Sequence, residues 1–304
     1  MIPVYNCSQF LTETLKSVLN QVTAQDMQIE VVDDASTDAN VEALVKQIGG
    51  GRIAYFRQPE NVGSLRNFET CINRSRGELI HILHGDDLVR LGFYEKLAYL
   101  FSKYPEAGAA FCRYNCIDEN GKSLYVKSPE SSQEGVLTDW LLTIAERQRI
   151  QYAAIAVRRE VYEKLGSFYG VNYGEDWEMW VRIARHYPFA YTPSILADYR
   201  KHPHSISGKK YLTGQYLKDI YIVTELIQSH LPIESKQHIL RRSRRYYASY
   251  GIKMAQNSWT KLKDEQAVNL QIKHALKLHK SPWIYWSIAK LYIKLALDKA
   301  WRSV

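Results

Sequence analysis

Three of the pairs of adjacent acidic residues in the first two thirds of the chain lie at the ends of predicted strands or helices. These three pairs are Asp33-Asp34, Asp86-Asp87 and Glu175-Asp176. Adjacent carboxylates repel each other unless a cation or a hydrogen-bond donor lies between them, and an unpaired buried charge is costly. Clustered acids at strand ends therefore favour binding of a divalent metal together with a phosphate. The alternative for each pair is a cap on the following helix, where Asp is preferred.

The pair Asp86-Asp87 follows residues 78–85, an apolar run that ends in Gly85. This run is predicted to form a buried strand that carries both carboxylates at its C-terminal end. In chains that alternate strands and helices, ligands bind at the carboxyl ends of parallel strands. We therefore expect a ligand site here; the alternative is a solvated loop that caps the helix starting near Leu91.

Short apolar segments alternate with amphipathic segments up to about residue 200. We expect strand residues at 1–6, 29–32, 53–56, 78–88, 107–111 and 195–199, and helical periodicity at 11–19, 41–48, 65–72, 93–101 and 177–184. The polar residues 118–136 are predicted to form a hairpin tip or a mobile loop. The alternation predicts an α/β fold, with a mostly parallel sheet and helices on both faces.

Charge is distributed unevenly along the chain. Residues 1–208 carry 22 Lys and Arg against 26 Asp and Glu, a net charge of −4, whereas residues 209–304 carry 18 against 6, a net charge of +12. From about Leu212 onward no strand is predicted. We therefore expect a domain at 1–208 and a basic helical region at 209–304 that faces an anionic partner.

Several classes of protein are disfavoured by missing motifs. No glycine-rich dinucleotide motif follows the first strand and no Walker-type phosphate loop occurs, which argues against dehydrogenases and P-loop enzymes. The cysteines match no zinc pattern and are too few for a disulfide framework, so we expect reduced, mostly buried thiols. They are Cys7, Cys71, Cys112 and Cys116. Without a secretory leader or a spanning segment in the sequence, we expect a cytosolic protein.

Seven short motifs resemble, in order and spacing, those of family 2 glycosyltransferases with the GT-A fold. They are Ile2-Pro3-Val4-Tyr5-Asn6, residues 31–38 (VVDDASTD), Asn61-Val62-Gly63 with Arg66-Asn67, Gly77-Glu78, Asp86-Asp87, Glu175-Asp176-Trp177 and Tyr199-Arg200-x-His202. Each motif is weak alone, but the ordered series is specific and covers about residues 1–207. The resemblance implies an enzyme that uses a nucleotide-sugar donor.

For the donor, the resemblance implies a role for five residues. Asp34 accepts a hydrogen bond from the base of the nucleotide-sugar, in a pocket that Pro3 and Tyr5 line. Arg66 and His202 hold the donor phosphates. For His202, the alternative is an ordinary turn histidine.

For catalysis, the resemblance implies a role for three further acids. Asp86 lies near the ribose and the metal, and Asp87 binds a Mg²⁺ or Mn²⁺ that also contacts the diphosphate. Asp176 is the general base that takes the proton from the acceptor hydroxyl, which implies inversion at the anomeric carbon. The alternative for Asp34 and for Asp176 is helix capping. Trp177 is either part of the core or an acceptor platform, and we assign Trp180 to the core.

The chain departs from the family pattern at two places. Relatives have an acid two positions before the Asp pair, where this chain has His84, so we expect a metal site with fewer charges or with an imidazole ligand. Relatives also have further strand residues before the motif at Pro3. Either the native start lies upstream of Met1, or the chain carries a shortened and less stable first strand.

These expectations together predict an inverting glycosyltransferase that moves a sugar onto a hydroxyl group of a saccharide or lipid-linked saccharide, in bacterial surface-polysaccharide or glycolipid synthesis. The alternative is a GT-A domain that binds nucleotides without turnover. Nucleic acid is not an expected partner, because no recognised nucleic-acid module accompanies the basic charge.

The C-terminal segment is predicted to lie on an anionic membrane surface without crossing it. A helix starting at Ser281-Pro282 carries aromatic and aliphatic residues over much of its surface, with lysines about once per turn. Upstream, the arginines of residues 241–245 add a basic cluster. The alternative is a helix that packs its apolar face on the catalytic domain and exposes its lysines to water.

Overall fold

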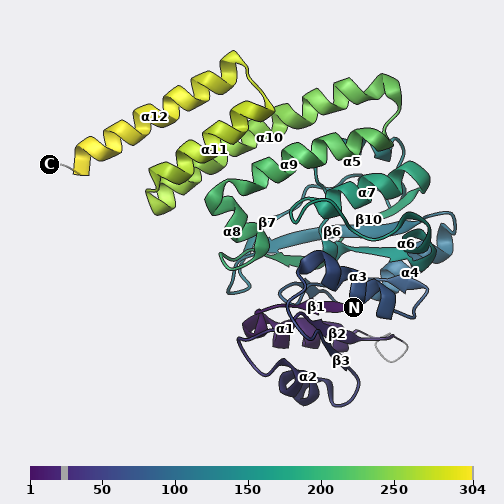
Figure 1. The fold of residues 1–304 in the computed structure, drawn as a ribbon. Coiled ribbons are helices and arrows are strands. Elements are labelled where there is room, and N and C mark those ends of the chain that lie inside the picture. Colours follow the sequence, from purple (N-terminus) through teal and green to yellow (C-terminus); the bar gives the residue numbers. More distant parts are fainter. Residues whose placement is uncertain (22–26, 303–304) are drawn as a thin grey trace. The chain divides into compact units, whose positions relative to one another are not determined.

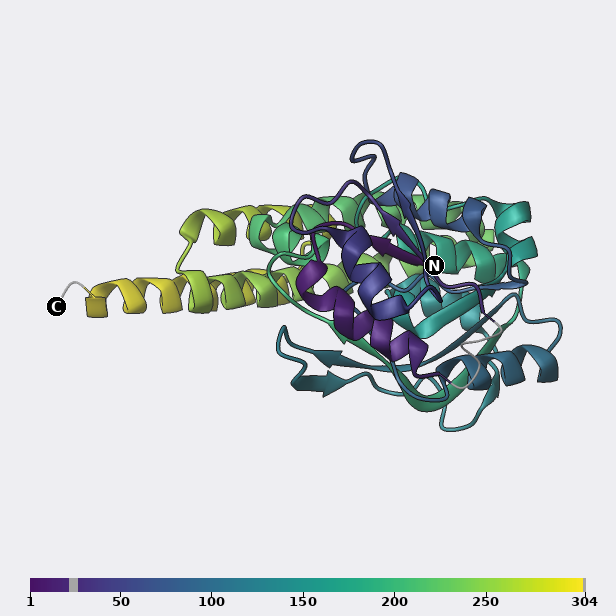
Figure 2. The same cartoon turned by 90° about the horizontal axis from the view of Figure 1, so that it is seen from below.

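The computed structural model of the chain describes residues 1–21 and 27–302 (Figures 1 and 2). The chain divides into two compact units. The first unit comprises residues 1–141, 149–172 and 179–202, and the second comprises residues 142–148, 173–178 and the chain from Pro203 onward. The predicted boundary at residue 208 stays a prediction.

The first unit begins with a parallel three-stranded sheet in the order β1-β2-β3. Its strands are β1 (Ile2–Val4), β2 (Glu30–Asp33) and β3 (Ala54–Arg57), connected by the helices α1 (Ser8–Leu19) and α2 (Val41–Gly49). Val31 and Val32 are fully buried, as are Leu11 and Leu15 of α1. Strand β2 therefore delivers Asp33 and Asp34 from a packed core, as the apolar pattern predicts.

The segment before Asp86 lies alongside β1. After β4 (Leu79–Ile80), the N-terminal amine of Met1 donates to the carbonyl of His81 at 2.9 Å, Leu83 N–H donates to Met1 at 3.0 Å, and Gly85 N–H donates to Pro3 at 3.2 Å. The predicted strand at 78–88 is thus shorter than expected as a regular strand, but it is extended and pairs with β1. This pairing brings the Asp86-Asp87 turn to the same sheet edge as Asp34.

The remaining strands form a mixed sheet in the order β4-β9-β6-β10-β5. They are β5 (Leu88–Val89), β6 (Ala109–Ile117), β7 (Ser123–Val126), β8 (Gly135–Val136), β9 (Ile155–Arg158) and β10 (Phe189–Arg200). Here β10 runs parallel to β6, and the other described pairings are antiparallel. The prediction of a mostly parallel sheet therefore holds for β1–β3 and is wrong for this sheet. Residues 118–136 form the expected hairpin tip, with β7 paired to β6.

Further helices alternate with the strands along the chain. The helices are α3 (Ser64–Arg74), α4 (Phe93–Lys103), α5 (Trp140–Glu146), α6 (Arg159–Leu165) and α7 (Glu175–His186), with a 3₁₀ turn at Tyr152–Ala154. Trp180 is buried against Tyr152 and Phe168, as predicted for a core residue. The cysteines are free and buried, which confirms the expected thiols.

The second unit is helical from Pro203 to Arg302, which confirms the expectation for this region. Its helices are α8 (Ile206–Thr213), α9 (Gln215–Leu226), α10 (Ile233–Leu262), α11 (Glu265–Leu278) and α12 (Pro282–Arg302), with a 3₁₀ turn at Ile227–His230. Helices α10, α11 and α12 lie side by side (Figure 1). Within the described residues, no helix combines the length and the apolar character needed to cross a membrane.

Candidate active site

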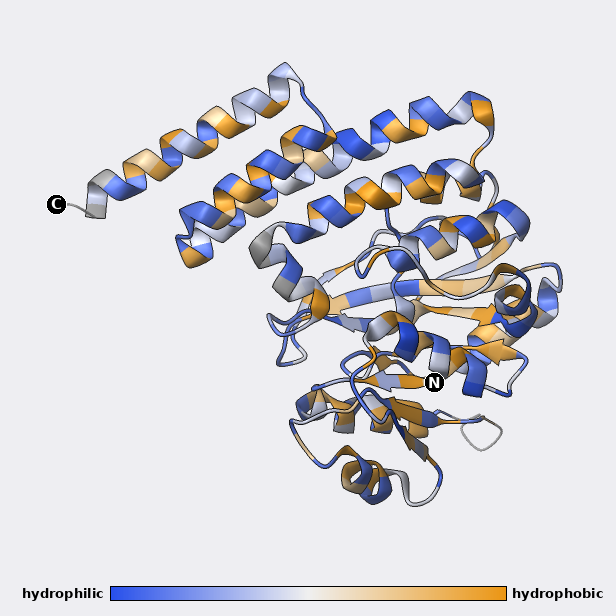
Figure 3. Cartoon of the chain, viewed as in Figure 1, coloured by the Kyte–Doolittle hydropathy of each residue, from blue (hydrophilic) through white to orange (hydrophobic). Residues whose placement is uncertain are grey.

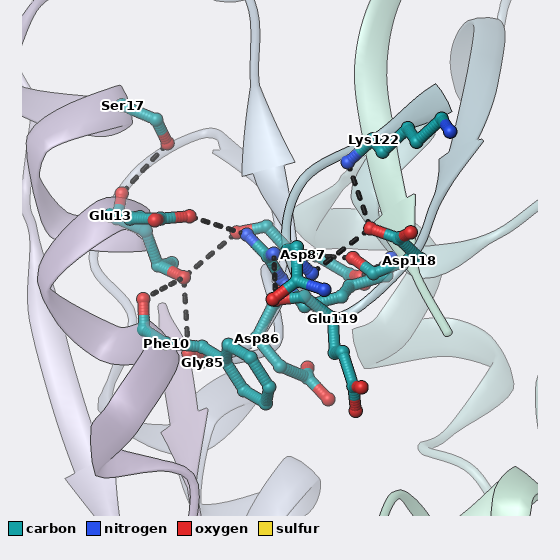
Figure 4. Close-up of polar contacts among 12 residues, drawn as sticks. Phe10, Glu13, Ser17, Gly85, Asp86, Asp87, Asp118, Glu119 and Lys122 are labelled. Atoms are coloured by element: carbon teal, nitrogen blue, oxygen red, sulfur yellow. Dashed lines mark hydrogen bonds and ion pairs between the residues drawn. The ribbon is translucent and has the colours of Figure 1, made fainter. Parts of the chain in front are cut away.

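The Asp86-Asp87 turn is held by hydrogen bonds from α1, from the end of β10 and from His202; Figure 4 shows the surroundings of the turn. Nε2 of His202 lies 2.9 Å from Oδ2 of Asp86, and the backbone N–H of Arg200 donates to Oδ1 of Asp87 at 2.8 Å. The hydroxyl of Thr14 lies 3.0 and 2.9 Å from the carbonyl oxygens of Gly85 and Asp87. Because α4 has Gly92 as its N-cap, the alternative that the acid pair caps this helix is wrong.

Gly85 places this turn directly against β1. A Cβ at this position would lie 2.8 Å from Sγ of Cys7 and 3.0 Å from Cγ2 of Val4, which is closer than real side-chain contacts allow. Only glycine lets the backbone approach this closely. The carboxylates are therefore positioned by backbone packing.

Arg200 is a functional residue of the turn to which the sequence analysis gave no role. Its guanidinium is buried, donates to the carbonyl of Asp86 at 2.9 Å and to that of Glu119 at 3.1 Å, and forms an ion pair with Glu13 at 2.6 Å. It also lies over the ring of Phe10 (Figure 4 shows Glu13, Phe10 and Glu119 around the turn). The sequence contains Arg200 within the motif Tyr199-Arg200-x-His202. The contacts of Arg200 could not be read from that motif, because they join residues that are far apart in the sequence.

The pKa values of the two carboxylates of the turn are shifted in opposite directions. Burial alone would raise the pKa of Asp86, but the hydrogen bond with His202 and the nearby His84 outweigh it, so its pKa is lowered. Burial and the Asp86 carboxylate raise the pKa of Asp87 well above its usual value, against the hydrogen bond from Arg200. A cation bound beside Asp87 would relieve its repulsion with Asp86.

His84, Asp86 and Asp87 form a cluster that can hold a divalent metal. Their ligand atoms all lie within 4.8 Å of one another. His84 packs between the rings of Phe68 and Tyr152, and burial lowers the pKa of His84, so its imidazole is neutral. Its Nε2 is buried, with no hydrogen-bond partner among the described residues. Two carboxylates with one imidazole fit Mn²⁺ and, less closely, Mg²⁺.

Asp34 lies in a loop junction at the end of β2. Its Oδ1 accepts from Val62 N–H at 2.8 Å and its Oδ2 from Gly63 N–H at 3.0 Å, and burial raises its pKa. The cap of α2 is Asn40, whose side chain accepts from Ala43 N–H, so the alternative that Asp34 caps this helix is wrong. The carboxylate keeps further lone pairs for a ligand.

The remaining donor residues predicted from sequence lie in the same unit. Pro3 is buried in β1, and Tyr5 follows it with half of its surface exposed. Arg66 lies exposed in the first turn of α3. His202 is buried, and its ring packs on Phe10. His202 therefore lies at the Asp86 site, and its role toward the donor phosphates stays a prediction.

Asp33 has a structural role that the sequence analysis did not predict. Its Oδ2 accepts from the hydroxyl of Tyr55 at 2.7 Å and from Arg57 at 2.6 Å, and its Oδ1 accepts from Ser36 N–H at 2.9 Å. These contacts hold the loop after β2 against β3. Asp33 thus orients the backbone that presents Asp34.

Asp176 lies in the second unit, in the first turn of α7. Gln148 donates from Nε2 to its Oδ2, and Trp177 N–H donates to its Oδ1 at 2.7 Å. Burial raises the pKa of Asp176 to about 7. Because α7 already begins at Glu175, Asp176 is not its N-cap. Trp177 is buried and donates from its indole to Ile144 at 2.7 Å, so it is a core residue.

Comparison with known proteins places the chain in a family. The model of the family described as "Glycosyl transferase family 2" matches residues 1–166. An uncharacterized glycosyltransferase of Rickettsia felis is 28% identical over 212 residues, which cover 69% of this chain and 35% of that protein. An uncharacterized glycosyltransferase of Rickettsia typhi is 25% identical and is covered over 63% of its length. The chain thus spans less than two thirds of these relatives.

Two solved structures share the fold. Staphylococcus aureus TarS 1–349 in complex with UDP-GlcNAc is 16% identical, with a TM-score of 0.65 over 99% of this chain and 90% of that chain. The mannosyltransferase PcManGT from Pyrobaculum calidifontis, in complex with GDP-Man and Mn²⁺, is 18% identical, with a TM-score of 0.59 over 100% and 86%. These likenesses confirm the predicted GT-A fold. Because the family model matches more than half of the chain and includes both acidic sites of the first unit, the chain belongs to glycosyl transferase family 2.

Proposed function

We propose that the protein transfers a sugar from a nucleoside-diphosphate sugar to a hydroxyl group of an acceptor, with inversion at the anomeric carbon. The observation that carries this proposal is the cluster of His84, Asp86 and Asp87, which lies at the same sheet edge as Asp34. A cation site suits the diphosphate of a nucleotide-sugar, and the nearby hydrogen-bond acceptor Asp34 suits its base. Two proteins of similar fold have titles that name nucleotide-sugars as ligands.

In this proposal the first unit binds the donor. Asp34 accepts from the base between Pro3 and Tyr5, Asp86 faces the ribose, and Arg66 with His202 contacts the phosphates. Asp87, together with His84 and Asp86, holds a Mg²⁺ or Mn²⁺. When bound, this ion supplies positive charge against the departing nucleoside diphosphate.

Asp176 acts as the general base in this proposal. The acceptor oxygen forms a bond to the anomeric carbon, the bond from that carbon to the diphosphate breaks, and the acceptor proton passes to Asp176. A base works best when its pKa lies near the working pH, and burial raises the pKa of Asp176 to about 7. Gln148 fixes the orientation of the carboxylate through its hydrogen bond to Oδ2.

We further propose that the protein acts at the cytoplasmic face of a bacterial membrane, on a saccharide or lipid-linked acceptor of surface polysaccharide or glycolipid. The support is an exposed face of α12, here called the outer stripe, in which residues repeat at helical spacing. The outer stripe consists of Trp283, Trp286, Lys290, Ile293, Lys294, Leu297 and Trp301. Trp301 is 85% exposed and Trp283 is 64% exposed. Aromatic residues with lysines suit a headgroup interface.

The packing of α12 explains how this face stays exposed. Ile284, Ile288, Leu291 and Leu295 are buried and form the side of α12 that packs in the helical stack. Apolar residues recur along the length of α12 (Figure 3). Of the arginine cluster at 241–245, Arg242 pairs with Glu146 and Arg244 with Glu225, whereas Arg241 and Arg245 are exposed. Basic charge is therefore offered to a membrane by these two arginines and by lysines.

The enzymatic proposal is tested by release of nucleoside diphosphate from UDP-, GDP- and dTDP-sugars with Mn²⁺, with and without saccharide acceptors. Turnover with one donor by the wild type, and its loss in Asp87→Ala, supports transfer. Binding of a donor with no turnover in any combination favours the alternative, a nucleotide-binding GT-A domain.

The membrane proposal is tested by flotation with vesicles that contain anionic lipid. The full chain should float at low salt, and the variant Trp286→Ser/Ile293→Ser/Leu297→Ser should not. The matched control changes three exposed apolar residues of the same unit that lie off the outer stripe, Ile222→Ser/Ile233→Ser/Leu262→Ser, and should float. Equal behaviour of both variants contradicts a role for the outer stripe.

A further inference from the structure

A groove of about 380 Å³ runs between α10 and α12 in the second unit. From α10 it is lined by Ser249, Lys253 and Gln256, and from α12 by Ser287, Lys290 and Lys294, above a floor of aliphatic side chains. Three ammonium groups thus line one groove together with two hydroxyls and an amide. None of its lining residues is acidic.

This arrangement suits an anion that carries both charge and hydrogen-bond acceptors. Like charges that line one groove repel each other, so an anion between them is favoured. Lys290 lies over the ring of Trp286 at 4.8 Å, which leaves its ammonium at the junction of the groove and the outer stripe. Oxygen atoms of a phosphate can accept from lysine, serine and amide donors together.

The groove also lies at a defined position around α12. At about 100° per residue, the groove side of α12 is adjacent to the outer stripe, and Trp283, Lys290 and Lys294 belong to both. If the outer stripe enters the boundary between headgroups and acyl chains, the groove lies at the depth of the lipid phosphates. The positive charge of the groove and its expected depth in the membrane both favour a lipid phosphate as the ligand.

We propose that this groove binds the phosphate of an anionic glycerophospholipid, which makes the membrane contact specific for a headgroup. This inference rests on the proposed membrane association and adds a discrete lipid site to it. Lys253, Lys290 and Lys294 contact the phosphate, and Ser249, Gln256 and Ser287 contact its oxygens or the glycerol hydroxyls.

The test compares two full-length variants that lose the same charge. The groove variant is Lys253→Gln/Lys290→Gln/Lys294→Gln, and the control variant is Lys261→Gln/Lys273→Gln/Lys277→Gln, which changes exposed lysines of the same unit outside the groove. On phosphatidylcholine vesicles with phosphatidylglycerol, the groove variant should bind about 100-fold more weakly. The control should stay within about threefold of the wild type, because its lysines lie away from the lipid.

A second measurement uses monomeric dihexanoyl phosphatidylglycerol, followed by NMR at the Trp283 indole. Saturable shifts in the wild type and the control, lost in the groove variant, support the lipid site. Three results overturn it: equal losses in both variants on vesicles, an unchanged titration in the groove variant, or full occupancy by inorganic phosphate with no further effect of the lipid. Circular dichroism and thermal melting confirm that the variants are folded.

The two proposals fail separately. If the wild type binds the soluble lipid but no vesicle, membrane association is wrong and the groove site stands. If the groove variant binds vesicles like the wild type while Trp286→Ser/Ile293→Ser/Leu297→Ser does not, membrane association stands and the lipid site is wrong. Trp286 and Ile293 do not line the groove.

Discussion

The backbone N–H of Arg200 donates a 2.8 Å hydrogen bond to Oδ1 of Asp87, a residue 113 positions earlier in the chain. The guanidinium of the same arginine donates to the carbonyl of Asp86. The last residue of β10 therefore holds both members of the acidic pair, one through its backbone and the other through its side chain.

We expect Arg200→Gln to lower the free energy of unfolding by about 3 kcal/mol, because it removes a buried guanidinium that donates to two backbone carbonyls and pairs with the exposed Glu13. Since the backbone of Asp86 loses its donor, Mn²⁺ affinity should also fall about 10-fold. Chemical denaturation and Mn²⁺ titration measure the two effects. The control Arg90→Gln removes the pair with Asp198, also on β10, and should lower stability alone. Unchanged Mn²⁺ affinity in Arg200→Gln would show that this arginine is only structural.

Asp87→Ala and Asp34→Ala should affect opposite ends of the donor. Asp87→Ala should abolish the metal dependence of nucleoside-diphosphate binding and leave binding of the bare nucleoside unchanged. Asp34→Ala should weaken both ligands by a similar factor. Calorimetric titration with and without Mn²⁺ measures this, and Asp38→Asn, an exposed acid of the same loop, is the control. If both variants lose the same affinity for the nucleoside and for the nucleoside diphosphate, Asp34 and Asp87 do not bind opposite ends of the donor.

Asp176→Asn should lower kcat by about 10²- to 10⁴-fold while donor affinity stays within about twofold, because the base acts on the acceptor proton. The variant keeps an acceptor for Gln148 and a similar shape. Steady-state kinetics with saturating donor measures the change. A variant that turns over near the wild-type rate removes Asp176 from the role of base.

The same carboxylate predicts two pH dependences. If Asp176 is the general base, activity requires its ionised form, so kcat should rise with pH through about 7 and level off above it. Stability should change in the opposite direction. The unfolded carboxyl ionises near 3.8 while the folded one keeps its proton to about 7, so the unfolded state binds fewer protons and this group destabilises the fold as pH rises from about 4 to 7. Below pH 4 the group contributes nothing.

Asp176→Asn removes that penalty, and it should therefore be more stable than the wild type at pH 8 by several kcal/mol and similar to it at pH 4. Denaturation at the two pH values measures the difference. A constant difference between the two proteins would mean that the pKa of Asp176 is not raised.

His84→Asp should change the metal preference of the cluster. A third carboxylate favours Mg²⁺, which prefers oxygen ligands, whereas the imidazole favours Mn²⁺. Without metal the variant should melt at a lower temperature, because three clustered acids repel one another. Thermal shifts with each ion measure both effects, and an unchanged ratio of Mn²⁺ to Mg²⁺ affinity indicates that His84 is not a ligand.

The sequence predicted those parts of the site that depend on local patterns. Apolar runs that end in acids located Asp34 and Asp86-Asp87, and helical spacing located the C-terminal helix that begins at Ser281-Pro282. The contacts of Arg200 could not be predicted, because they join residues that are distant in sequence. Strand direction in the second sheet was missed for the same reason, since an apolar run such as β6 looks alike in parallel and antiparallel pairings.

If the outer stripe of α12 binds a membrane as proposed, binding requires no refolding of the helix. The buried side, with Ile284 and Leu291, and the outer stripe are separated by about 140° around the helix axis. The helix can therefore meet lipid while its contacts in the helical stack remain. Far-ultraviolet circular dichroism should be the same in solution and on vesicles, while the fluorescence of Trp301 and its neighbours shifts to shorter wavelength. Association then carries no ordering cost for the backbone, so even a shallow and reversible contact suffices to hold the enzyme at a surface.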